Sequence, residues 1–450
     1  MRGMAKIEHV TAHEVLDSRG NPTVEAVVVC QGGYQGVTIV PSGASTGKYE
    51  AHELRDKDSQ RYGGKGVRQA VEHVKGEIHA ALLGKDTANQ NKIDRLLLEL
   101  DGTLDKSRLG ANAILAVSLS CARAEAAAQG LPLYLYLQQL FPKRELVIPV
   151  PQMNLINGGK HANNNLSVQE FHVLPVGSVS FAEALRMGVE IYQALKVALA
   201  EEKYEVIIGD ESGFAPRLDK SETAFTLLTR AIERAGYAPG IDAYLGVDVA
   251  ASEFFDPDAH RYTLDGTQLV AGDLAYQYKT WRERYPLISI EDPFDQDDWP
   301  AWQQFMKRSG QFVQVVGDDL YATNSTRIRE GIIQGATNAV LIKPNQVGTL
   351  TETLQAILLA QEAGQNIVIS HRSGETEDDF IADLSVAVGA GQIKTGAPLR
   401  SDRNAKYNRL IRIESETGAK LGHTLNAFLE FAKPHYEQAG DVRVTSSHAV

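Results

Sequence analysis

The sequence predicts an α/β protein in which a small α+β domain precedes a larger β/α barrel. The chain has 450 residues, which is too many for one ordinary domain and suits a barrel with a smaller partner. In its second part, short apolar runs alternate with segments of helical length, a pattern typical of parallel strands joined by right-handed crossovers. We therefore expect an N-terminal domain at residues 1–140 and a barrel domain with a C-terminal tail at residues 141–450.

The N-terminal domain is expected to contain strands first and helices second. Apolar and polar residues alternate from Lys6 to about Val40, interrupted by turn residues at Ser18–Pro22 and Gln31–Gly33. This pattern predicts a three-stranded meander. From Val67 to Leu140 the apolar residues recur with a helical period. Strands followed by helices indicate an α+β domain.

Two glycine-bearing loops stand out. Pro41–Gly47 consists of small residues, and its glycines allow either a flexible linker or a mobile lid; composition alone favours the linker. The second loop, Asn154–Asn163, lies near the start of the barrel domain and carries His161. A histidine in such a loop is more often a surface residue than a functional one.

Charged residues follow the predicted barrel strands at the points where these strands end. Leu287–Ile290 is a short apolar run, and Glu291 comes directly after it. The same pattern recurs at four more strand ends, which carry Asp248, Asp318, Lys343 and the pair His371–Arg372. Parallel strands have their carboxyl ends on one side, so these residues should converge on the face where a β/α barrel holds its active site.

Two further strands are predicted nearer the start of the barrel. Val168–Pro175 carries Gln169 and Glu170 near its beginning, and a long amphipathic helix follows it from about Phe181 to Glu201. Val206–Gly213 is predicted to be a strand that ends in acids, among them Glu211.

The acids at the strand ends indicate a metal site. Asp248, Glu291 and Asp318 are hard oxygen ligands of the kind that magnesium prefers. A single acid after a strand is more often a solvated turn residue or a helix cap. Asp292 and Asp319, each one residue past a candidate ligand, are expected to be such caps.

Composition excludes some functions. The formal net charge of -12 argues against nucleic acid or an anionic membrane as the main partner. Cys30 and Cys121 lie in apolar runs and are expected to be reduced core residues. The sequence contains no run of residues typical of a signal peptide or a membrane span, so we expect a cytoplasmic protein that requires no membrane.

Several segments resemble the signature segments of the enolase family, in the family's order: Ser42–Gly47, Gly209–Gly213, Ser289–Pro293, Gly317–Leu320, Lys343–Gln346, Ser370–Glu377 and Gln392–Pro398. The resemblance extends from about Ile7 to Glu416, and its motifs are specific only when taken together. Ser212 is a departure, because the family usually has glycine there. A side chain at that position disfavours a positive φ and so places the turn beside Glu211 in question.

The resemblance implies an enolase-type barrel and a cytoplasmic glycolytic lyase. Its reaction would be the reversible dehydration of 2-phosphoglycerate to phosphoenolpyruvate, through α-proton abstraction and an enediolate. Removing that proton adds a second negative charge to a carboxylate, which explains the need for divalent metal. The resemblance also implies two Mg²⁺ ions per active site, one bound tightly and one with substrate, and a homo-oligomer that is a dimer or a multiple of dimers.

The roles implied by the resemblance are carried over residue by residue. Lys343 resembles the catalytic base and Glu211 the acid. Asp248, Glu291 and Asp318 resemble the ligands of the tight metal, and Ser45 resembles the contact to the second one. The residues similar to substrate-binding groups are His161, Gln169, Glu170, His371, Arg372, Ser373 and Lys394. In isolation a strand-end lysine is more often a rim residue, and only the resemblance outweighs that interpretation.

Two alternatives remain open. Another enzyme of the enolase superfamily, such as a racemase or an ammonia-lyase, would share the metal acids but not the whole set of segments. A non-catalytic interaction protein on the same fold would be expected to have lost catalytic residues, and this sequence retains them.

Overall fold

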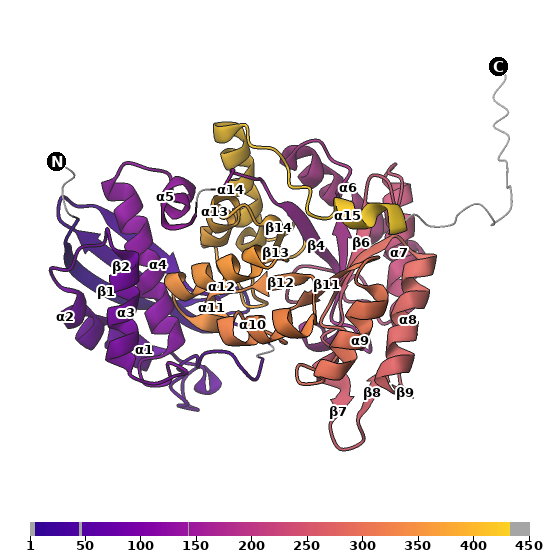
Figure 1. Cartoon of the computed structure of the whole chain (residues 1–450), viewed down its shortest axis with the longest axis horizontal. Coiled ribbons are helices and arrows are strands. Elements are labelled where there is room, and N and C mark those ends of the chain that lie inside the picture. Colours follow the sequence, from indigo (N-terminus) through magenta and orange to yellow (C-terminus); the bar gives the residue numbers. More distant parts are fainter. Residues whose placement is uncertain (1–4, 45–46, 143, 433–450) are drawn as a thin grey trace, which may run out of the picture.

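The structure is a computed structural model that describes residues 5–44, 47–142 and 144–432. Figure 1 shows two parts side by side, a small N-terminal unit and a barrel. The small unit begins with an antiparallel meander, as predicted, in which β2 lies between its neighbours. Its strands are β1 (Ile7–Leu16), β2 (Pro22–Cys30) and β3 (Gln35–Ile39).

Helices cover one face of this meander. They are α1 (Arg68–His73), α2 (His79–Leu82), α3 (Gln90–Asp101), α4 (Ala111–Ala128) and α5 (Leu133–Leu140). Helix α4 is rich in alanine and is buried on almost every side, so its backbone can approach the sheet closely. A Cβ atom at Gly36 of β3 would lie 2.0 Å from the carbonyl oxygen of Ser120, so only glycine permits this contact.

The second part is a closed barrel of eight strands, in the order β10-β11-β12-β13-β14-β4-β5-β6. The fold class predicted from the sequence is thereby confirmed. The strands are β4 (Val150–Asn157), β5 (Glu170–Leu174), β6 (Tyr244–Asp248), β10 (Leu287–Glu291), β11 (Gln314–Gly317), β12 (Ala339–Ile342), β13 (Asn366–Ser370) and β14 (Gly391–Lys394).

Helices surround the barrel and account for the alternation seen in the sequence (Figure 1). They are α6 (Phe181–Glu201), α7 (Ser221–Arg234), α8 (Ala271–Arg284), α9 (Trp299–Ser309), α10 (Ser325–Gln334), α11 (Pro344–Val347), α12 (Leu350–Glu362), α13 (Phe380–Ala387), α14 (Ser401–Thr417) and α15 (Asn426–Leu429). Within the described ranges, no helix combines the length and the apolar character that crossing a membrane requires.

The expectation of an all-parallel barrel is wrong at one strand. β5 runs antiparallel to both β4 and β6. The segment between β4 and β5 contains only a short 3-10 turn, Gly159–His161. A parallel return usually runs through a helix along the barrel, and this segment contains none, so the chain turns back antiparallel instead.

The strand predicted at Val206–Gly213 is also absent. Ile208 alone in this segment forms a bridge, to Phe214 just after it. Gly209 and Gly213 pack against Asn157 too closely for a Cβ atom, and the chain reverses between them. The apolar residues before Gly209 therefore lead into a turn that packs against β4.

A small antiparallel sheet was not predicted. It consists of β7 (Phe255–Asp256), β8 (Arg261–Leu264) and β9 (Thr267–Leu269) and projects from the barrel at the bottom of Figure 1. Its strands are too short to give a clear alternating pattern in the sequence.

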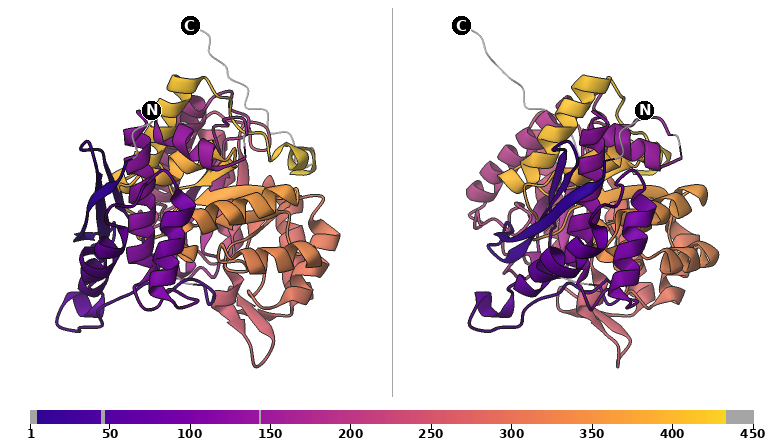
Figure 2. Two further views of the ribbon diagram at one scale, coloured as in Figure 1. Left: turned by 60° about the vertical axis from the view of Figure 1, so that its left-hand side comes forward. Right: turned by 90° about the vertical axis from the view of Figure 1, so that its left-hand side faces the viewer.

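The small unit packs against the barrel beside α11 and α12 (Figures 1 and 2). Asp94 of α3 accepts hydrogen bonds from the backbone N–H and the hydroxyl of Thr351, at the start of α12. Arg123 of α4 pairs with Asp378 at 2.8 Å. These contacts bring the segment after β3 to the barrel, where Ser42 forms a backbone bridge with Gly374.

Candidate active site

The strand ends bring acids and a lysine together. Asp248 ends β6 and lies beside Glu291, which ends the neighbouring β10. Lys394 ends β14, and its Nζ lies 2.7 Å from Glu291 Oε1, 3.2 Å from Asp248 Oδ2 and 3.2 Å from Glu170 Oε2. All four side chains are buried. Gln169, beside Glu170, donates to the same Asp248 oxygen at 3.5 Å.

Asp318 and Lys343 form a second pair, directly after β11 and β12. Lys343 Nζ donates to Asp318 Oδ2, and Gln346 Nε2 donates to Asp318 Oδ1 at 2.9 Å. Burial lowers the pKa of Lys343, but the nearby carboxylates, with Asp318 first and Glu291 after it, together hold it above its ordinary value. The pKa of Asp318 is lowered despite its burial, because Lys343 and Lys394 are close.

The buried acids fit a hard cation. Burial and the neighbouring Asp248 raise the pKa of Glu291 well above its usual range. Glu291 Oε2 is buried and has no hydrogen-bond partner within the described residues. Carboxylates that repel one another in a dry site are stabilised by a divalent cation, and oxygen ligands suit magnesium.

Among the residues that the structure describes, two compact groups of possible metal ligands differ from the predicted set. In each, the ligand atoms lie within 4.8 Å of one another: His161, Glu170 and Glu211 form one, and Asp292, Asp318 and Asp319 form the other. In the predicted set, Asp248 and Glu291 instead share the ammonium of Lys394.

The prediction that Asp292 and Asp319 cap helices is wrong. The caps of α9 and α10 are Asp298 and Asn324, several residues further along the chain. Asp292 instead accepts the backbone N–H groups of Asp318 at 3.0 Å and Asp319 at 2.8 Å. It therefore fixes the turn after β11, which carries Asp318.

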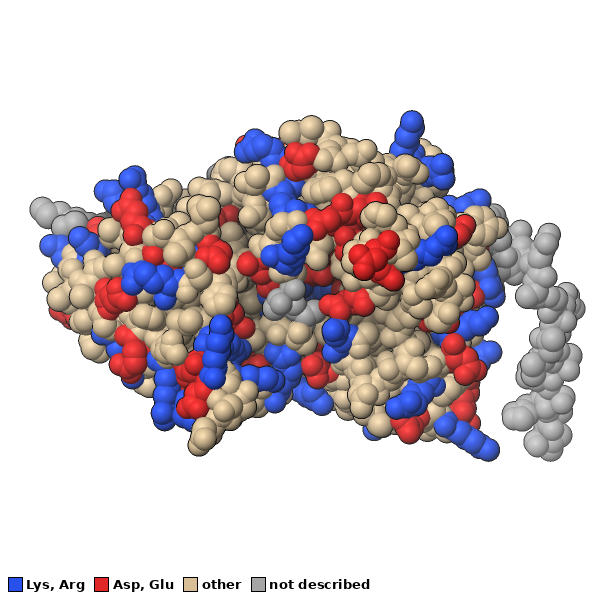
Figure 3. Space-filling view, turned by 90° about the horizontal axis from the view of Figure 1, so that it is seen from below, with Lys and Arg blue, Asp and Glu red and all other residues tan. Residues whose placement is uncertain are grey.

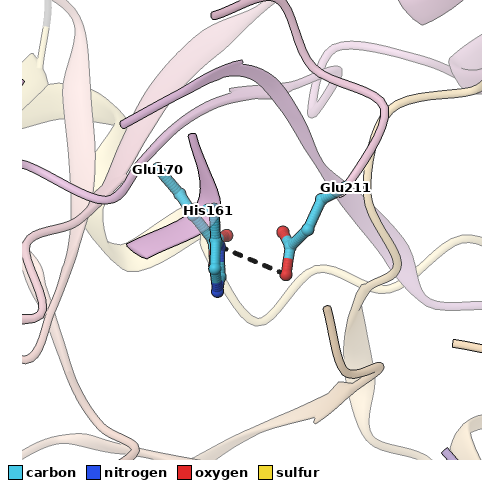
Figure 4. Close-up of side chains that lie close together, drawn as sticks. All are labelled: His161, Glu170 and Glu211. Carbon is cyan, nitrogen blue, oxygen red and sulfur yellow. Dashed lines mark ion pairs between the residues drawn. The ribbon is translucent and has the colours of Figure 1, made fainter. Parts of the chain in front are cut away.

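Glu170, which pairs with Lys394, also belongs to a second cluster, in which a histidine lies between two carboxylates (Figure 4). His161 Nδ1 is 3.4 Å from Glu170 Oε1 and 3.4 Å from Glu211 Oε1. Burial lowers the pKa of His161, but Glu211 and Glu170 raise it above its ordinary value. His172 Nε2 lies 2.8 Å from Glu170, and Asn154 Nδ2 donates to Glu211 Oε2 at 2.9 Å.

Glu211 also faces a second histidine. His371 Nε2 lies 3.3 Å from Glu211 Oε2, and His371 Nδ1 lies 2.5 Å from the guanidinium of Arg403. Burial, helped by Arg403, lowers the pKa of His371 to about 4 although Glu211 opposes the change. Burial and Glu170 raise the pKa of Glu211, but His161 and His371 outweigh them and hold it far below its ordinary value.

The segment after β13 meets the loop after β3. Ser373 Oγ accepts the backbone N–H of Ala44 at 2.6 Å. Arg372 is buried, and its guanidinium donates to Glu50 at 2.9 Å and to Asn345 at 3.1 Å. Ser45, predicted to contact the second metal, lies outside the described residues.

Ser212 adopts a positive φ, the conformation that a side chain at this position disfavours. Its φ is +70°, in the left-handed region that favours glycine. Its hydroxyl is buried without a hydrogen-bond partner in the described part of the chain. The turn beside Glu211 therefore forms, with the strain of a side chain at this position.

Some residues that contact the candidate site were not predicted from the sequence. His172 could have been found, because it lies two residues after Glu170 on a strand and so on the same face. Glu50 lies just after the glycine-bearing loop Pro41–Gly47, outside the residues predicted to belong to the site. Arg403 gave no signal, because nothing in its sequence surroundings distinguishes a buried arginine from an exposed helical one.

This arrangement defines a two-domain barrel protein with an acid–base site at the ends of its barrel strands. A family model described as "Enolase, C-terminal TIM barrel domain" matches residues 145–430, and one described as "Enolase, N-terminal domain" matches residues 7–137. The chain belongs to the enolase family, as the resemblance implied. This membership indicates a lyase-type enzyme that acts on a small molecule, in a family that generally uses Mg²⁺.

Proposed function

We propose that this protein is a phosphopyruvate hydratase, which dehydrates 2-phosphoglycerate reversibly to phosphoenolpyruvate. The observation that carries the proposal is that one buried, charged site holds Lys343 and Glu211 in different surroundings. Lys343 follows β12 and pairs with Asp318. Glu211 instead lies beside two histidines, His161 and His371.

Such a placement suits a reaction in which a proton and a hydroxide leave neighbouring carbons. Lys343 removes the α-proton. The charges of Asp318 and Glu291 raise the pKa of Lys343, so a cation that offsets them would lower this pKa and leave more of the lysine unprotonated and able to accept a proton. Magnesium held by Asp248, Glu291 and Asp318, with Ser45 contacting a second ion, would neutralise the negative charge that proton removal puts on the substrate carboxylate, as in the enolase superfamily generally.

The leaving hydroxide needs a proton. Glu211 is ionised in the substrate-free protein, because the histidines hold its pKa low. His161, 3.4 Å away with a raised pKa, can share its proton with Glu211. In the hydration direction the ionised Glu211 instead accepts a proton from the attacking water.

The remaining residues bind and orient the substrate. Arg372 and Ser373 hold the phosphate, for which a planar guanidinium is well shaped. The other substrate contacts in the proposal are Lys394, Gln169, Glu170, His161 and His371.

The proposal is tested by separating the two steps. In Lys343→Ala, exchange of the α-proton with heavy water and dehydration should fall together. In Glu211→Gln, deuterium should still enter the α position while phosphoenolpyruvate formation drops roughly 10²-fold or more. An NMR time course of 2-phosphoglycerate in heavy water measures both.

Lys203→Ala is a matched control for the lysine, because Lys203 is exposed beyond the end of α6. If Glu211→Gln loses exchange as completely as Lys343→Ala, the two roles are not divided as proposed. Exchange at the wild-type rate in Lys343→Ala would make Lys394 the next candidate base. Turnover of another carboxylate, without turnover of 2-phosphoglycerate, would favour a different superfamily reaction.

The proposal includes a cytoplasmic homodimer or multiple of dimers, with an N-terminal domain at residues 1–140 and a barrel domain at residues 141–450. It includes no nucleic-acid partner. On the described part of the face in Figure 3, acidic and basic side chains are intermixed and form no broad basic field. Light scattering that gives a monomer at micromolar concentration would contradict the oligomer.

A further inference from the structure

A carboxylate from the small domain binds the guanidinium of Arg372. Glu50 Oε2 lies 2.9 Å from Nη1 of Arg372, and Glu50 Oε1 lies 3.2 Å from Nη2. The two side chains are 9% and 3% exposed, so the pair is almost fully removed from water. This is the parallel, two-bond geometry in which a guanidinium binds either a carboxylate or a phosphate.

We propose that Glu50 holds the anion position of Arg372 in the substrate-free protein, and that a phosphate-bearing ligand binds by displacing the Glu50 carboxylate. The inference rests on the proposed function for the identity of the ligand, but its geometry does not. Both Glu50 oxygens use the N–H groups that a phosphate needs for a two-bond contact. The two anions therefore compete for Arg372.

The guanidinium keeps a support when Glu50 leaves. Asn345 Oδ1 accepts from Arg372 Nη1 at 3.1 Å, and this asparagine lies on the barrel side in α11. A cleft of about 270 Å³ opens beside the pair, lined among others by Gly43, Gly47 and Glu53. The cleft offers room for the displaced carboxylate.

Displacement of the Glu50 carboxylate would also remove a hydrogen bond from the glycine loop. Glu50 Oε1 accepts the backbone N–H of Gly47 at 2.9 Å. It also accepts from Gln346 Nε2 at 3.5 Å, and Gln346 donates to Asp318 at 2.9 Å. Glu50 thus connects Arg372, the end of the loop and the turn that carries Asp318. A phosphate that takes its place releases the Gly47 N–H from this hydrogen bond.

The test compares two glutamates in the same cleft. Glu50→Gln keeps the size of the side chain but removes the charge that competes with phosphate. Glu53→Gln is the matched control, because Glu53 pairs with Arg55 at 2.7 Å. Inorganic phosphate is titrated into each full-length protein by calorimetry. Glu50→Gln should bind it at least roughly tenfold more tightly than wild type, equivalent to about 1.4 kcal/mol, and Glu53→Gln should stay within about twofold.

The gain must depend on the arginine. In an Arg372→Ala background, Glu50→Gln should give no gain in phosphate affinity. An unchanged or weakened affinity in Glu50→Gln overturns the proposal and makes Glu50 a residue that only orients Arg372. An equal gain in Glu53→Gln also overturns it, because the effect would then be general charge removal.

A thermal unfolding curve checks that Glu50→Gln is folded. If it is not, Glu50→Asp gives the same test, since the shorter side chain cannot keep both bonds; a gain in phosphate affinity supports the proposal and no gain overturns it. Turnover of 2-phosphoglycerate by the wild-type protein is measured separately. A gain in phosphate affinity without such turnover would keep the role of Glu50 and reject the proposed reaction.

Discussion

The Arg403 guanidinium lies 2.5 Å from Nδ1 of His371, and this contact fixes the tautomer of the histidine. A guanidinium has only donors, so Nδ1 must accept and the proton of a neutral His371 is on Nε2. Nε2 lies 3.3 Å from Glu211 Oε2, but the two atoms do not have hydrogen-bond geometry. The guanidinium also donates to the carbonyl oxygens of Arg372, Ser373 and Asp210, and its Nε lies 2.8 Å from Asp402 Oδ2. Arg403 is thus a positioning residue for two segments of the site.

We predict that His371 stays neutral, with its proton on Nε2, from about pH 5 to 8, because its pKa is about 4. Nitrogen-15 NMR of labelled histidine measures both properties. In Arg403→Gln, the histidine signal should move toward a mixture of tautomers and kcat should fall roughly 10–100-fold, the scale for loss of a group that orients a catalytic residue.

Arg412→Gln is the control, because Arg412 lies on the exposed face of the same helix, α14. It should change neither the NMR signal nor kcat. A histidine that remains on the Nε2–H tautomer in Arg403→Gln would show that another group holds it.

Replacing Ser212 by glycine should stabilise the protein. The substitution removes the strain of a side chain at φ +70° and a buried hydroxyl without a partner in the described residues. Glycine also increases the freedom of the unfolded chain, so we expect a net gain of about 1 kcal/mol in the free energy of unfolding. Urea unfolding measures it. Ser212→Ala is the control, because alanine removes the hydroxyl but keeps the strain. Equal stability of the two variants would assign the gain to the hydroxyl.

Asp94 should make stability depend on pH. Burial raises the pKa of Asp94 from 3.8 to about 6, although Ser118 and Thr351 donate hydrogen bonds to it. The folded state therefore binds this proton more tightly than the unfolded state. The resulting stabilisation is complete below about pH 4 and is lost as the pH rises through about 6.

Between about pH 7 and 5, wild type should gain about 1.4 kcal/mol relative to Asp94→Asn, the free energy of one pKa unit. Urea unfolding of both proteins at several pH values measures the difference. It is the slope with pH that matters, because asparagine also alters the hydrogen bonds at this domain contact. Identical slopes would mean that Asp94 does not titrate in this range.

Removal of metal should abolish activity and lower stability. We expect EDTA to stop turnover and magnesium to restore it. Saturating magnesium should also raise the free energy of unfolding by about 2.7 kcal/mol at 100 times its dissociation constant, since it binds the folded state. Glu291→Gln should lose most of that gain, whereas Glu283→Gln, at an exposed position on α8, should keep it. Full activity after thorough removal of metal would refute the assignment of Asp248, Glu291 and Asp318.

Much of the fold follows from local patterns in the sequence. The strand that ends at Glu291 and the helix Phe181–Glu201 were predicted closely, because a short continuous apolar run and a long run with helical period are different patterns. The antiparallel course of β5 was missed, because the direction of a strand depends on whether the connection before it contains a crossover helix rather than on the residues in the strand. Val206–Ile208 has the composition of a strand, but packing beside β4 decided its conformation.

The candidate site, like the fold, could be predicted only in part. Parallel strand ends must meet at one face, so the sequence could predict that Asp248, Asp318 and Lys343 belong to one region. It could not predict that Lys394 would lie between Glu170, Asp248 and Glu291, because these contacts join residues 103 to 224 positions apart. The sequence could not predict the contacts of Arg403 with the site for the same reason.

The position of Lys394 on the last strand has a consequence for the order in which the protein is made. The ribosome completes Glu170, Asp248 and Glu291 long before it reaches β14, and domains begin to fold while synthesis continues. Until β14 joins β13 to β4, the ring of strands stays open and these acids have no Lys394 ammonium to balance them. A nascent chain that ends before β14 therefore keeps the carboxylates in water, and the last strand supplies ring closure and counter-ion in one event.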